Sequence, residues 1–337
     1  MLTMETTTIA GVEVSRFGLG TWAIGGSEWG EVSEQEAVAA ILSASERGIN
    51  LIDTAPIYGH GRAEELVGKA VRQHGHRDAF YVATKTGLDW SHGNCESNST
   101  PARLRQELED SLRRLGIDCI DLYQVHWPDT RTPIAETASL LSEFVQEGKV
   151  RSLGVSNFSV AQMEEFRRIT PLASNQPPYN IFERGIDQPH ADAPAVLPWC
   201  AANGISVLTY SPLCRSLLGG HPRPGSSFDS HDIRHVDPKF QEPHFTQYRT
   251  AVERLATFAQ EHFGKSVLEL AARWVLDRPG VSTVLWGAKR PTQVVSIDGV
   301  LGWHLDADAM TQIDQIVFSS VLDPVGPEYL KPSVRRD

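Results

Sequence analysis

The chain contains 337 residues, of which 41% are hydrophobic and 22% are charged, and its net charge is −11. This length and composition exclude a mini-protein, a collagen and a coiled coil, and they leave either two modest domains or one large α/β barrel. The excess of acidic residues has the wrong sign for a protein that neutralises nucleic-acid phosphates, so we expect no nucleic acid among its partners.

Four widely spaced cysteines (Cys95, Cys119, Cys200 and Cys214) offer neither a disulfide framework nor a paired zinc motif, which is typical of a reducing compartment. The first residues, MLTMETTTIAG, lack the basic and apolar regions of a secretion signal. No stretch approaches the ~20 apolar residues of a membrane span. The sequence therefore predicts a cytoplasmic protein without a membrane partner, and it leaves the oligomeric state open.

Short β-branched runs alternate with amphipathic stretches along the whole chain. The stretch 34–48 shows the helical pattern, because Ser33 with Glu36 predicts a capping box and Gly48 predicts a left-handed end. Thr100 is the expected N-cap of a later helix. The further elements that we expect are strands at 17–21, 50–54, 80–85, 119–125, 150–154, 172–175, 205–210 and 281–286, and helices at 63–72, 101–115, 133–147, 159–169, 193–202, 247–263, 266–277 and 291–299.

Eight strands that alternate with helices predict an α/β fold in which parallel strands close into a (β/α)8 TIM barrel. We expect one domain over residues 1–337, with an N-terminal hairpin at 7–16, a long polar loop at 214–246 after strand seven, and a tail at 320–337. An open doubly wound sheet is the alternative, but the glycines of GLGTWAIGG lack the third glycine of a dinucleotide fingerprint. No helix is expected directly after them, and a tight turn explains them better.

Reacting groups in such barrels collect at the carboxyl ends of the strands. This criterion selects Trp22, Asp53, Tyr58, Lys85, His126, Ser156, Asn157, Gln176 and Tyr210. Individually, Asp53 also fits a helix cap and Lys85 its ion-pair partner, while His126 fits a core histidine and Tyr58 a surface loop. Their convergence on one face of the fold favours a catalytic site.

Asp53, Tyr58, Lys85 and His126 suit proton delivery to a carbonyl oxygen. A phenol is a weak acid at neutral pH, but a nearby ammonium lowers its pKa, so we expect Lys85 to activate Tyr58. Asp53 then orients the lysine, and His126 binds the substrate oxygen or joins the proton relay. Because no side chain donates hydride, a reduction needs a nicotinamide cofactor.

Several motifs together resemble the aldo-keto reductase superfamily from about residue 10 to 320, namely GINLIDTAPIYGHGRAEELVGKAV, YVATK, SLRRLGIDCIDLYQVHWPD, GKVRSLGVSNFS and NQPPYN. Details such as GTWAIGG and VLWGAKRP are similar to bacterial members of the general stress protein type, which are family 11-like. The resemblance implies a (β/α)8 barrel that binds NADPH across its C-terminal mouth. It also implies a catalytic tetrad of Asp53, Tyr58, Lys85 and His126, with Tyr58 as the acid in reduction.

The resemblance further implies three groups of cofactor contacts. Besides Trp22, they are Ser156, Asn157, Gln176 and Tyr210 at the nicotinamide, Ser211, Leu213 and Arg215 at the pyrophosphate, and Gly287, Lys289, Arg290 and Gln293 at the adenosine and 2′-phosphate. Two cations in the last group favour NADP. A basic solvated helix start is the alternative, so NAD stays possible. Ser296 and Ile297 stand where the family often has a Glu-Asn pair, which predicts weaker cofactor binding or a less strict choice between NADP and NAD.

Aromatic and histidine residues add weaker signals. Trp22 and Trp127 are expected in the substrate pocket, and Trp29 and Trp90 in loops around the mouth of the barrel. Histidines at 221, 231, 235 and 244 could suggest a metal site, but the prolines among them favour a loop that covers the cofactor or shapes the pocket. We therefore predict no bound metal.

The leading functional prediction is an NADP-dependent reductase of aldehydes or ketones, including small hydroxy-carbonyls or sugar-derived ones. One alternative is a Schiff-base lyase that uses Lys85, against which Asp53 argues because it raises the pKa of that lysine. Another is a non-catalytic NADP-binding regulatory barrel. Only the intact tetrad in the sequence argues against the regulatory alternative.

Overall fold

Eight parallel strands close into a barrel in the computed structural model, which describes residues 3–26, 29–91, 93–189, 193–220, 228 and 232–335. Around the barrel they follow the order β3 (Phe17–Gly20), β4 (Leu51–Asp53), β5 (Tyr81–Thr86), β8 (Ile120–Val125), β9 (Val150–Ser156), β10 (Ser174–Gln176), β11 (Ser206–Thr209) and β12 (Val281–Gly287). Strand β12 pairs in parallel with β3 and completes the closure. The predicted (β/α)8 barrel is confirmed.

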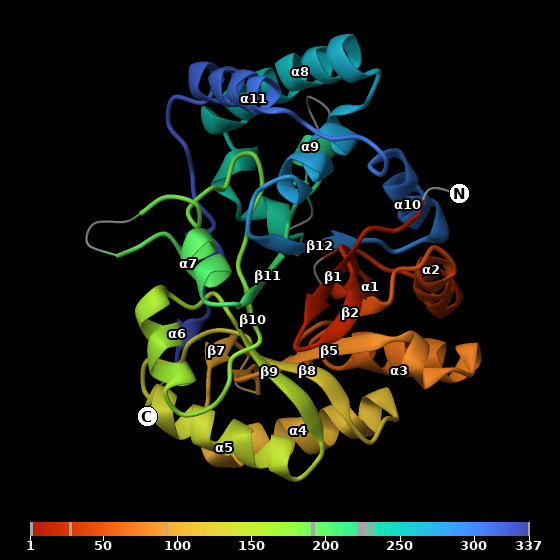
Figure 1. Cartoon of the computed structure of the whole chain (residues 1–337), viewed down its shortest axis with the longest axis vertical. Helices are drawn as coiled ribbons and strands as arrows, with labels where there is room; N and C mark the ends of the chain where they lie inside the picture. The colour runs from red at the N-terminus through yellow and green to blue at the C-terminus, as the bar shows by residue number, and fades with distance from the viewer. Residues whose placement is uncertain are drawn as a thin grey trace.

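Helices surround the barrel on its outside, and Figure 1 shows α8 and α11 side by side along one flank. The α-helices are α1 (Trp22–Gly25), α2 (Glu34–Glu46), α3 (Arg62–His74), α4 (Pro101–Leu115), α5 (Ile134–Gln146), α6 (Val160–Arg167), α7 (Val196–Ala202), α8 (His244–Phe263), α9 (Val267–Leu276), α10 (Pro291–Val295) and α11 (Ala307–Ser320). The 3₁₀ helices are η1 (Arg77–Ala79), η2 (Leu217–Gly219), η3 (Ile233–His235), η4 (Pro238–Phe240), η5 (Ser296–Gly299) and η6 (Glu328–Leu330).

Helix α4 shows how local sequence sets an element. Pro101 is its first residue, and Gly116 ends it in the left-handed region with a φ of 66°. Leu104, Leu108 and Leu115 recur at helical spacing and are buried, while Leu112 is partly buried. The predicted N-cap is wrong in one respect, because the Thr100 hydroxyl donates to Asn98 Oδ1 at 2.7 Å and no helix N–H bonds to it.

Other helix boundaries also differ from the prediction. Helix α7 begins at Val196 and not at 193, and the expected helix 291–299 divides into α10 and the tighter 3₁₀ turn η5. The expected capping box of α2 is half formed: the Ser33 side chain accepts the Glu36 N–H, while the Glu36 carboxylate also bonds to the Ser33 hydroxyl. Such end effects depend on side-chain partners that periodicity does not specify.

Strand β3 packs against apolar side chains inside the barrel, and this explains Gly18. A Cβ on Gly18 would lie 2.3 Å from Leu51 Cδ2 and 2.8 Å from Leu285 Cδ2. The glycine therefore provides close packing in the barrel interior, and the predicted tight turn does not account for it. The one-turn helix α1 also follows β3 directly, contrary to expectation.

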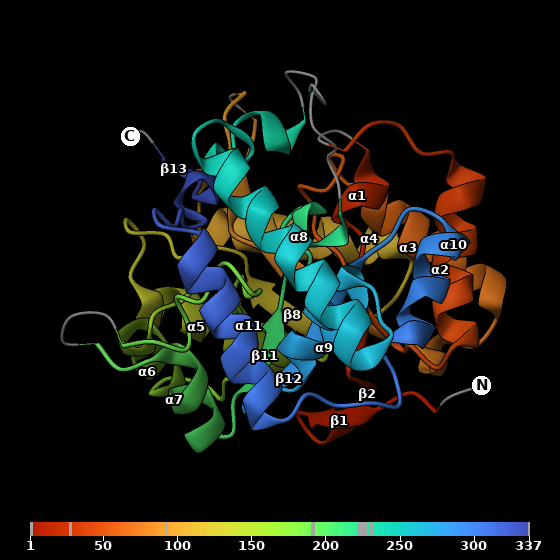
Figure 2. The ribbon, with the colours of Figure 1, turned by 90° about the horizontal axis from the view of Figure 1, so that it is seen from above.

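The barrel interior is apolar below its mouth. Its buried cluster joins side chains from five barrel strands with two from the hairpin of β1 (Thr6–Ile9) and β2 (Val12–Ser15), namely Ile9, Val14, Leu51, Tyr81, Ala83, Leu122, Leu208 and Leu285. Figure 2 shows the hairpin at one end of the barrel and β13 towards the other. Polar strand-end groups therefore lie at the end away from the hairpin.

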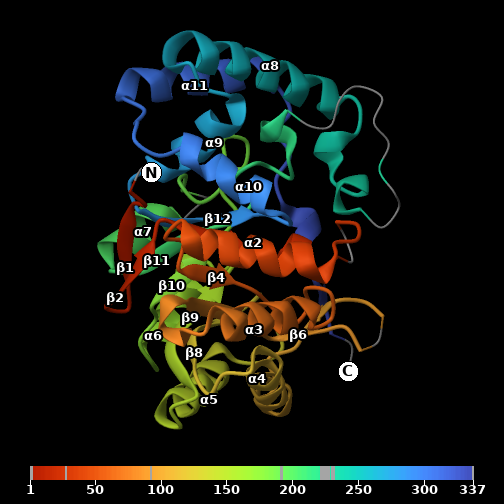
Figure 3. The same ribbon diagram turned by 90° about the vertical axis from the view of Figure 1, so that its right-hand side faces the viewer.

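The C-terminal segment folds back over the barrel. Strand β13 (Ser333–Val334) pairs in parallel with β7 (Glu96–Ser97), which pairs antiparallel with β6 (Leu88–Asp89). Figure 3 shows the C-terminus on the side of β6, opposite the hairpin. The sequence analysis expected only a tail at 320–337 and missed this small sheet, because two-residue strands carry no pattern.

No helix within the described ranges combines the length and the apolar character that a bilayer crossing needs.

We expect Gly68→Ala to lower the free energy of unfolding by about 1–3 kcal/mol. Alanine is ordinarily better than glycine inside a helix by about 1 kcal/mol. Here, however, the added Cβ would lie 2.3 Å from the Leu115 backbone oxygen, where α3 packs against the end of α4. Urea denaturation measures the change. Gly219→Ala is the control, because its nearest neighbour lies at 3.9 Å, and a stabilised Gly68→Ala protein would contradict the close contact.

Candidate active site

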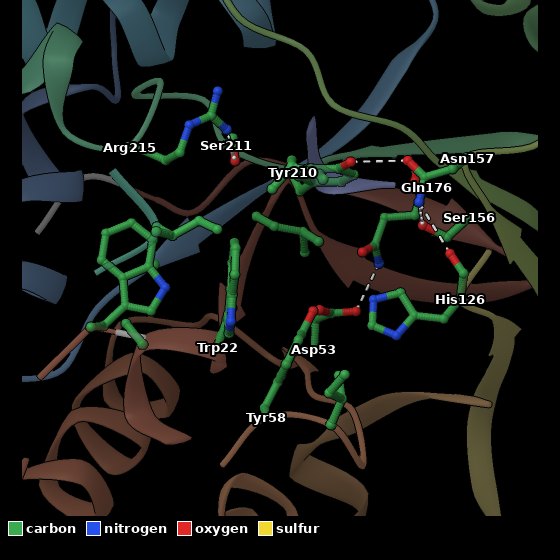
Figure 4. A pocket seen from close by; sticks show the side chains of 18 of the residues that line it. Trp22, Asp53, Tyr58, His126, Ser156, Asn157, Gln176, Tyr210, Ser211 and Arg215 are labelled. Carbon is green, nitrogen blue, oxygen red and sulfur yellow. Dashed lines mark hydrogen bonds between the residues drawn. The ribbon is translucent and has the colours of Figure 1, made fainter. Parts of the chain in front are cut away.

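A cavity of about 600 Å³ opens at the carboxyl ends of the barrel strands. Most of the predicted site residues line it: Trp22, Asp53, Tyr58, His126, Trp127, Ser156, Asn157, Gln176, Tyr210, Ser211, Leu213, Arg215, Gly287, Lys289 and Gln293. Figure 4 shows Asp53, Tyr58 and His126 close together, with Trp22 beside Tyr58. Lys85 is fully buried next to this wall, and Arg290 is largely exposed and does not line the cavity.

Lys85 and Asp53 form a buried ion pair next to Tyr58. Lys85 Nζ donates to Asp53 Oδ2 at 2.6 Å, to the Thr54 backbone oxygen at 3.0 Å and to Tyr58 Oη at 3.2 Å. An ammonium has three hydrogens, and these three acceptors account for all of them. The Tyr58 oxygen thus accepts a hydrogen bond from the Lys85 ammonium.

Burial shifts the pKa of Lys85 in a direction opposite to the effect of its ion pair. Asp53 does raise the pKa of Lys85, as expected. The net pKa nevertheless lies below the ordinary value, because removal of the ammonium from water outweighs the attraction of the carboxylate. The contribution of Asp53 that the sequence predicted is therefore present, but the lost hydration, which the sequence did not include, is larger.

His126 follows β8 and faces the edge of the Tyr58 ring. The ring centroids lie 5.9 Å apart and the planes meet at 83°. Burial, and secondly the Lys85 charge, hold the pKa of His126 well below its ordinary value. The imidazole is therefore neutral at pH 7, with one nitrogen that donates and one that accepts.

Close backbone contacts position the loop that carries Tyr58. A Cβ on Gly25, at the end of α1, would lie 2.6 Å from the Tyr58 carbonyl carbon. Gly59 has a φ of 60°, and a Cβ there would lie 2.3 Å from the Gly25 oxygen. Trp22, from the same helix, stacks on the Tyr58 ring at a centroid distance of 6.1 Å. Helix α1 thus fixes both the backbone and the ring of Tyr58.

Two buried glutamates hold β5 from the helix side. Thr84 and Thr86 flank Lys85 on this strand and donate at 2.7 Å to Glu64 of α3 and Glu107 of α4, respectively. Burial raises the pKa of Glu107 to about 7. The sequence analysis missed both glutamates, because a glutamate on an amphipathic helix is ordinarily exposed.

A hydrogen-bonded network connects the ends of β9, β10 and β11 to the ion pair. Tyr210 Oη donates to Asn157 Oδ1 at 2.9 Å, and Asn157 Nδ2 donates to Ser156 Oγ at 3.0 Å. Ser156 Oγ donates to the Gln176 backbone oxygen at 2.6 Å, and Gln176 Nε2 donates to Asp53 Oδ1 at 2.8 Å. Burial raises the pKa of Tyr210, so its phenol stays protonated at neutral pH.

The opposite end of the cavity lies near the basic start of α10. Lys289 Nζ donates to the Trp29 backbone oxygen, and the Lys289 N–H donates to Gln293 Oε1 at 2.8 Å. Arg290 Nε lies 3.0 Å from Glu36 Oε1, and 60% of the Arg290 side chain is exposed. Burial, together with the nearby arginine charges, lowers the pKa of Lys289. Two cations therefore lie at this end, one half-buried and one in solvent.

Ser296 and Ile297 stand at the positions where the resemblance implies a Glu-Asn pair. Ile297 is completely buried, so its side chain packs in the core. Ser296 Oγ donates to the Gln293 backbone oxygen at 2.7 Å. Neither residue lines the cavity.

Arg215 is more deeply embedded than the sequence analysis suggested. Its guanidinium pairs with Glu183 and, through Nε, with Asp237 Oδ2 at 2.7 Å, and its side chain is 1% exposed. It also lies 3.5 Å from Ser211 Oγ at the cavity wall. Two carboxylates thus already match the charge of Arg215.

The donor set fits an extended nicotinamide dinucleotide. Hydroxyl and amide groups surround one end of the cavity, an aromatic ring lies beside them, and cations lie at the other end. No described atom lies within 4 Å of a Cβ built on Gly287, so the wall is open there. Trp29 Nε1 is buried in the lining, and the described residues provide no hydrogen-bond partner for it.

Part of the cavity wall was not predicted. The additional lining residues include Ile57, Leu88, Asn94, Cys95, Ile233, Arg234, Tyr329, Leu330, Lys331, Pro332 and Ser333. The C-terminal ones reach the cavity through the fold of the tail, so no local motif marks them. Arg234 lies in the loop expected to cover the cofactor, and its guanidinium carbon lies 5.7 Å from the centre of the Trp29 ring.

The histidine-rich segment gives no metal site within the part of the chain that the structure describes. There, no group of three His, Cys, Asp or Glu side chains is arranged to hold a metal ion. His221 and His231 lie outside the described residues.

Comparison with known proteins places these features in a family. A profile described as "Aldo/keto reductase family" matches residues 16–317. The "Aldo-keto reductase YhdN" of Bacillus subtilis (strain 168) is 47% identical over 336 residues, which cover 99% of this chain and 100% of that protein. The "NADH-specific methylglyoxal reductase" of Escherichia coli (strain K12) is 35% identical over 88% of this chain and 93% of that protein.

Solved structures agree with the fold. The glycerol dehydrogenase AKR11B4 from Gluconobacter oxydans superposes with a TM-score of 0.85 at 44% identity, covering 97% of this chain and 99% of that one. An aldo/keto reductase from Klebsiella pneumoniae in complex with NADP and acetate gives a TM-score of 0.70 at 28% identity, covering 94% and 96%. These relatives include both an NADH-specific protein and one that holds NADP.

We expect the His126 ring to stay neutral in the folded protein when the pH falls from 7.5 to 6. Its folded pKa lies below the unfolded value of 6.5, so the unfolded chain takes up the proton first. The free energy of unfolding therefore decreases as the pH falls below 6.5. Nitrogen-15 NMR of the imidazole, assigned with His126→Asn, measures the protonation. In urea the same ring should titrate near 6.5. A folded-state midpoint at or above 6.5 would contradict the burial argument.

Proposed function

Because this chain belongs to the aldo/keto reductase family, we propose that it is an NADP-dependent oxidoreductase that reduces aldehyde or ketone carbonyls to alcohols, with Tyr58 as general acid. One observation carries the proposal: Lys85 Nζ lies 3.2 Å from Tyr58 Oη and 2.6 Å from Asp53 Oδ2, at the wall of the cavity. The pairing supplies a proton donor where a carbonyl oxygen can bind. We also propose that residues 1–337 form one barrel domain.

Proton transfer follows from the hydrogen bonds around Tyr58. As the Tyr58 proton moves to the substrate oxygen, negative charge develops on Oη, and the Lys85 ammonium stabilises it at short range. Asp53 keeps that ammonium protonated and oriented. Neutral His126 donates a hydrogen bond to the substrate oxygen and steers it towards Tyr58. In the reverse direction, the same groups let Tyr58 accept the proton of an alcohol.

The nicotinamide cofactor supplies the hydride when it is bound. Ser156, Asn157 and Gln176 are the residues proposed to hold the carboxamide, and Tyr210 the face of the ring. Ser211, Leu213 and Arg215 are proposed at the pyrophosphate. Gly287, Lys289, Arg290 and Gln293 are proposed at the adenosine and its 2′-phosphate. The connected amide network supports the first group, since it keeps these polar side chains oriented.

The preference for NADP rests on Lys289 and Arg290. A 2′-phosphate is a dianion, whereas NAD carries a hydroxyl at the same position, so two cations favour NADP. Arg290 is exposed and paired with Glu36, and Ser296 and Ile297 add no contact. We therefore propose a moderate preference in which NAD also binds.

Small oxygen-rich carbonyl compounds are the proposed substrates. The expected pocket residues Trp22 and Trp127 line the cavity beside Tyr58 and His126, together with Ile57. Aromatic walls bind the apolar faces of small hydroxy-carbonyls or sugar-derived carbonyls, while Tyr58 and His126 bind their oxygen. Two relatives are named for glycerol and for methylglyoxal, both small oxygenated compounds.

The geometry disfavours a Schiff-base lyase. The lowered pKa of Lys85 suits a nucleophilic amine, but its side chain is 0% exposed and all three of its hydrogens have acceptors. A substrate carbonyl therefore has no path to Nζ. A regulatory barrel remains the second candidate, which NADPH binding without turnover across a broad carbonyl panel would favour.

Four free cysteines support the proposed cytoplasmic location.

We expect Tyr58→Phe to lower kcat by about a hundred- to ten-thousand-fold, because general acid catalysis contributes that much. NADPH binding should be nearly unchanged, since the Phe ring keeps the stacking with Trp22. NADPH oxidation at 340 nm with a panel of aldehydes, ketones and sugars measures turnover, and fluorescence titration measures binding. Tyr81→Phe is the control, because its hydroxyl bonds to Ser152 away from the cavity. Turnover by Tyr58→Phe at the wild-type rate would refute the assigned acid.

Arg290→Ala should raise the KM for NADPH about tenfold and leave the KM for NADH nearly constant, because a charge-assisted bond to a phosphate is lost. Steady-state kinetics with both cofactors measures the two ratios. Arg113→Ala is the matched control, since that exposed arginine pairs with Asp110 on α4. Equal changes in the KM values for NADPH and NADH would show that Arg290 does not bind the 2′-phosphate.

A further inference from the structure

A second set of buried charges lies away from the Lys85–Asp53 pair. It comprises Glu183, Arg215, Asp237 and Lys239, and each side chain is 1% exposed or less. Arg215 pairs with both carboxylates, and Lys239 Nζ lies 2.9 Å from Glu183 Oε1. Two cations therefore match two anions, as buried charges require. We call these four residues the buried charge cluster.

The buried charge cluster fixes a strained loop at the cavity wall. After β11, Ser211, Cys214, Arg215 and Ser216 have φ values of 57°, 46°, 54° and 73°, in the left-handed region that side chains disfavour. Such a backbone persists only where surrounding contacts hold it. The ion pairs of Arg215 supply those contacts. The same loop is the proposed pyrophosphate site, so its shape matters for cofactor binding.

The C-terminal tail docks on the same cluster through Tyr329. Tyr329 Oη donates to Asp237 Oδ2 at 2.8 Å, and the Arg215 guanidinium carbon lies 5.2 Å from the centre of the Tyr329 ring. Lys239 Nζ donates to the Gly326 backbone oxygen at 3.1 Å. One tyrosine thus contacts both the anion and the cation that hold the loop after β11.

From Tyr329 the tail continues along the cavity wall. Leu330, Lys331 and Pro332 line the cavity, and the Ser333 N–H donates to the Cys95 backbone oxygen at 3.0 Å. Cys95 belongs to the segment between β6 and β7, which lines the cavity as well. The tail therefore joins the charge cluster at one end to the β6–β7 segment at the other.

We propose that Tyr329 is a positioning residue that couples the loop after β11 to the cavity wall formed by the tail. This inference rests on the proposed function, because it takes the loop as the cofactor side and the tail as part of the substrate side. Cofactor binding on the loop stabilises the positions of Arg215 and Asp237. Because Tyr329 contacts both residues, its own position is then stabilised, and the motion of residues 330–333 decreases. Coupling of this kind is reciprocal, so substrate also strengthens cofactor binding.

The test compares wild type with Tyr329→Phe, which removes one hydroxyl and keeps the ring over Arg215. Hydrogen exchange of residues 329–335 is measured with and without NADPH. We expect NADPH to slow exchange there in wild type and to slow it far less in the variant. The KM for the best carbonyl substrate should rise about tenfold, because a hydrogen bond to a charged group is lost, while kcat changes less than about twofold. A merely structural role would not split KM from kcat.

Tyr179→Phe is the matched control, because its hydroxyl also donates to a carboxylate, Asp187 Oδ2 at 2.7 Å, which belongs neither to the tail nor to the buried charge cluster. Equal effects in both variants, or wild-type exchange and KM in Tyr329→Phe, would overturn the inference. If wild type neither binds NADPH nor reduces any carbonyl, the proposed function fails instead.

Ser333→Pro gives a second test in case Tyr329→Phe does not fold. It removes the N–H that bonds to Cys95 and leaves the buried charge cluster intact. The substrate KM should rise while the affinity for NADPH alone stays at the wild-type value. An unchanged KM would show that the tail does not position the substrate wall, and would overturn the inference.

Discussion

The ion pair between Lys85 and Asp53 constrains the whole mouth of the barrel. Both side chains are almost entirely removed from water, so neither charge is tolerable without the other, and loss of one partner of such a pair costs about 3–5 kcal/mol. Each remaining hydrogen and lone pair therefore needs a partner. Thr54 and Tyr58 accept from Lys85, while Gln176 and Gln124 donate to the second oxygen of Asp53. The position of Tyr58 follows from this requirement.

The barrel supplies the surroundings in which this pair is effective. Below the pair, apolar side chains from the strands and the hairpin fill the interior and exclude water. Above it lies the cavity, into which Tyr58 and His126 project. A charge at this boundary keeps a strong field towards the cavity, because little solvent screens it from below. The Lys85 ammonium can therefore stabilise charge on a neighbouring phenol.

Buried charge also organises the periphery. The loop after β11 places Cys214, Leu217 and Leu218 in the hydrophobic core. The loop and the C-terminal tail are also held against the barrel by polar contacts of the buried charge cluster. Loss of one partner from such a cluster is costly, because it leaves an uncompensated buried charge. Two separate sets of ion pairs thus contribute to the cavity wall.

The sequence by itself determined the barrel and the residues at its mouth. Strand and helix periodicities are local, so β8 and α4 could be predicted from a dozen residues each, and strand ends place Asp53, Lys85 and His126 on one rim in any closed parallel barrel. The loop after Asp53 added Tyr58, and the family motifs agree with that selection.

The tertiary structure decided what depends on partners distant in the chain. The net direction of the Lys85 pKa required the depth of burial, which periodicity does not give. The roles of Glu64 and Glu107 depend on which helix faces β5. The tail reached the cavity through two-residue strands and a tyrosine that bonds 92 residues away, and no local pattern encodes such contacts because their energy arises only once the chain has closed.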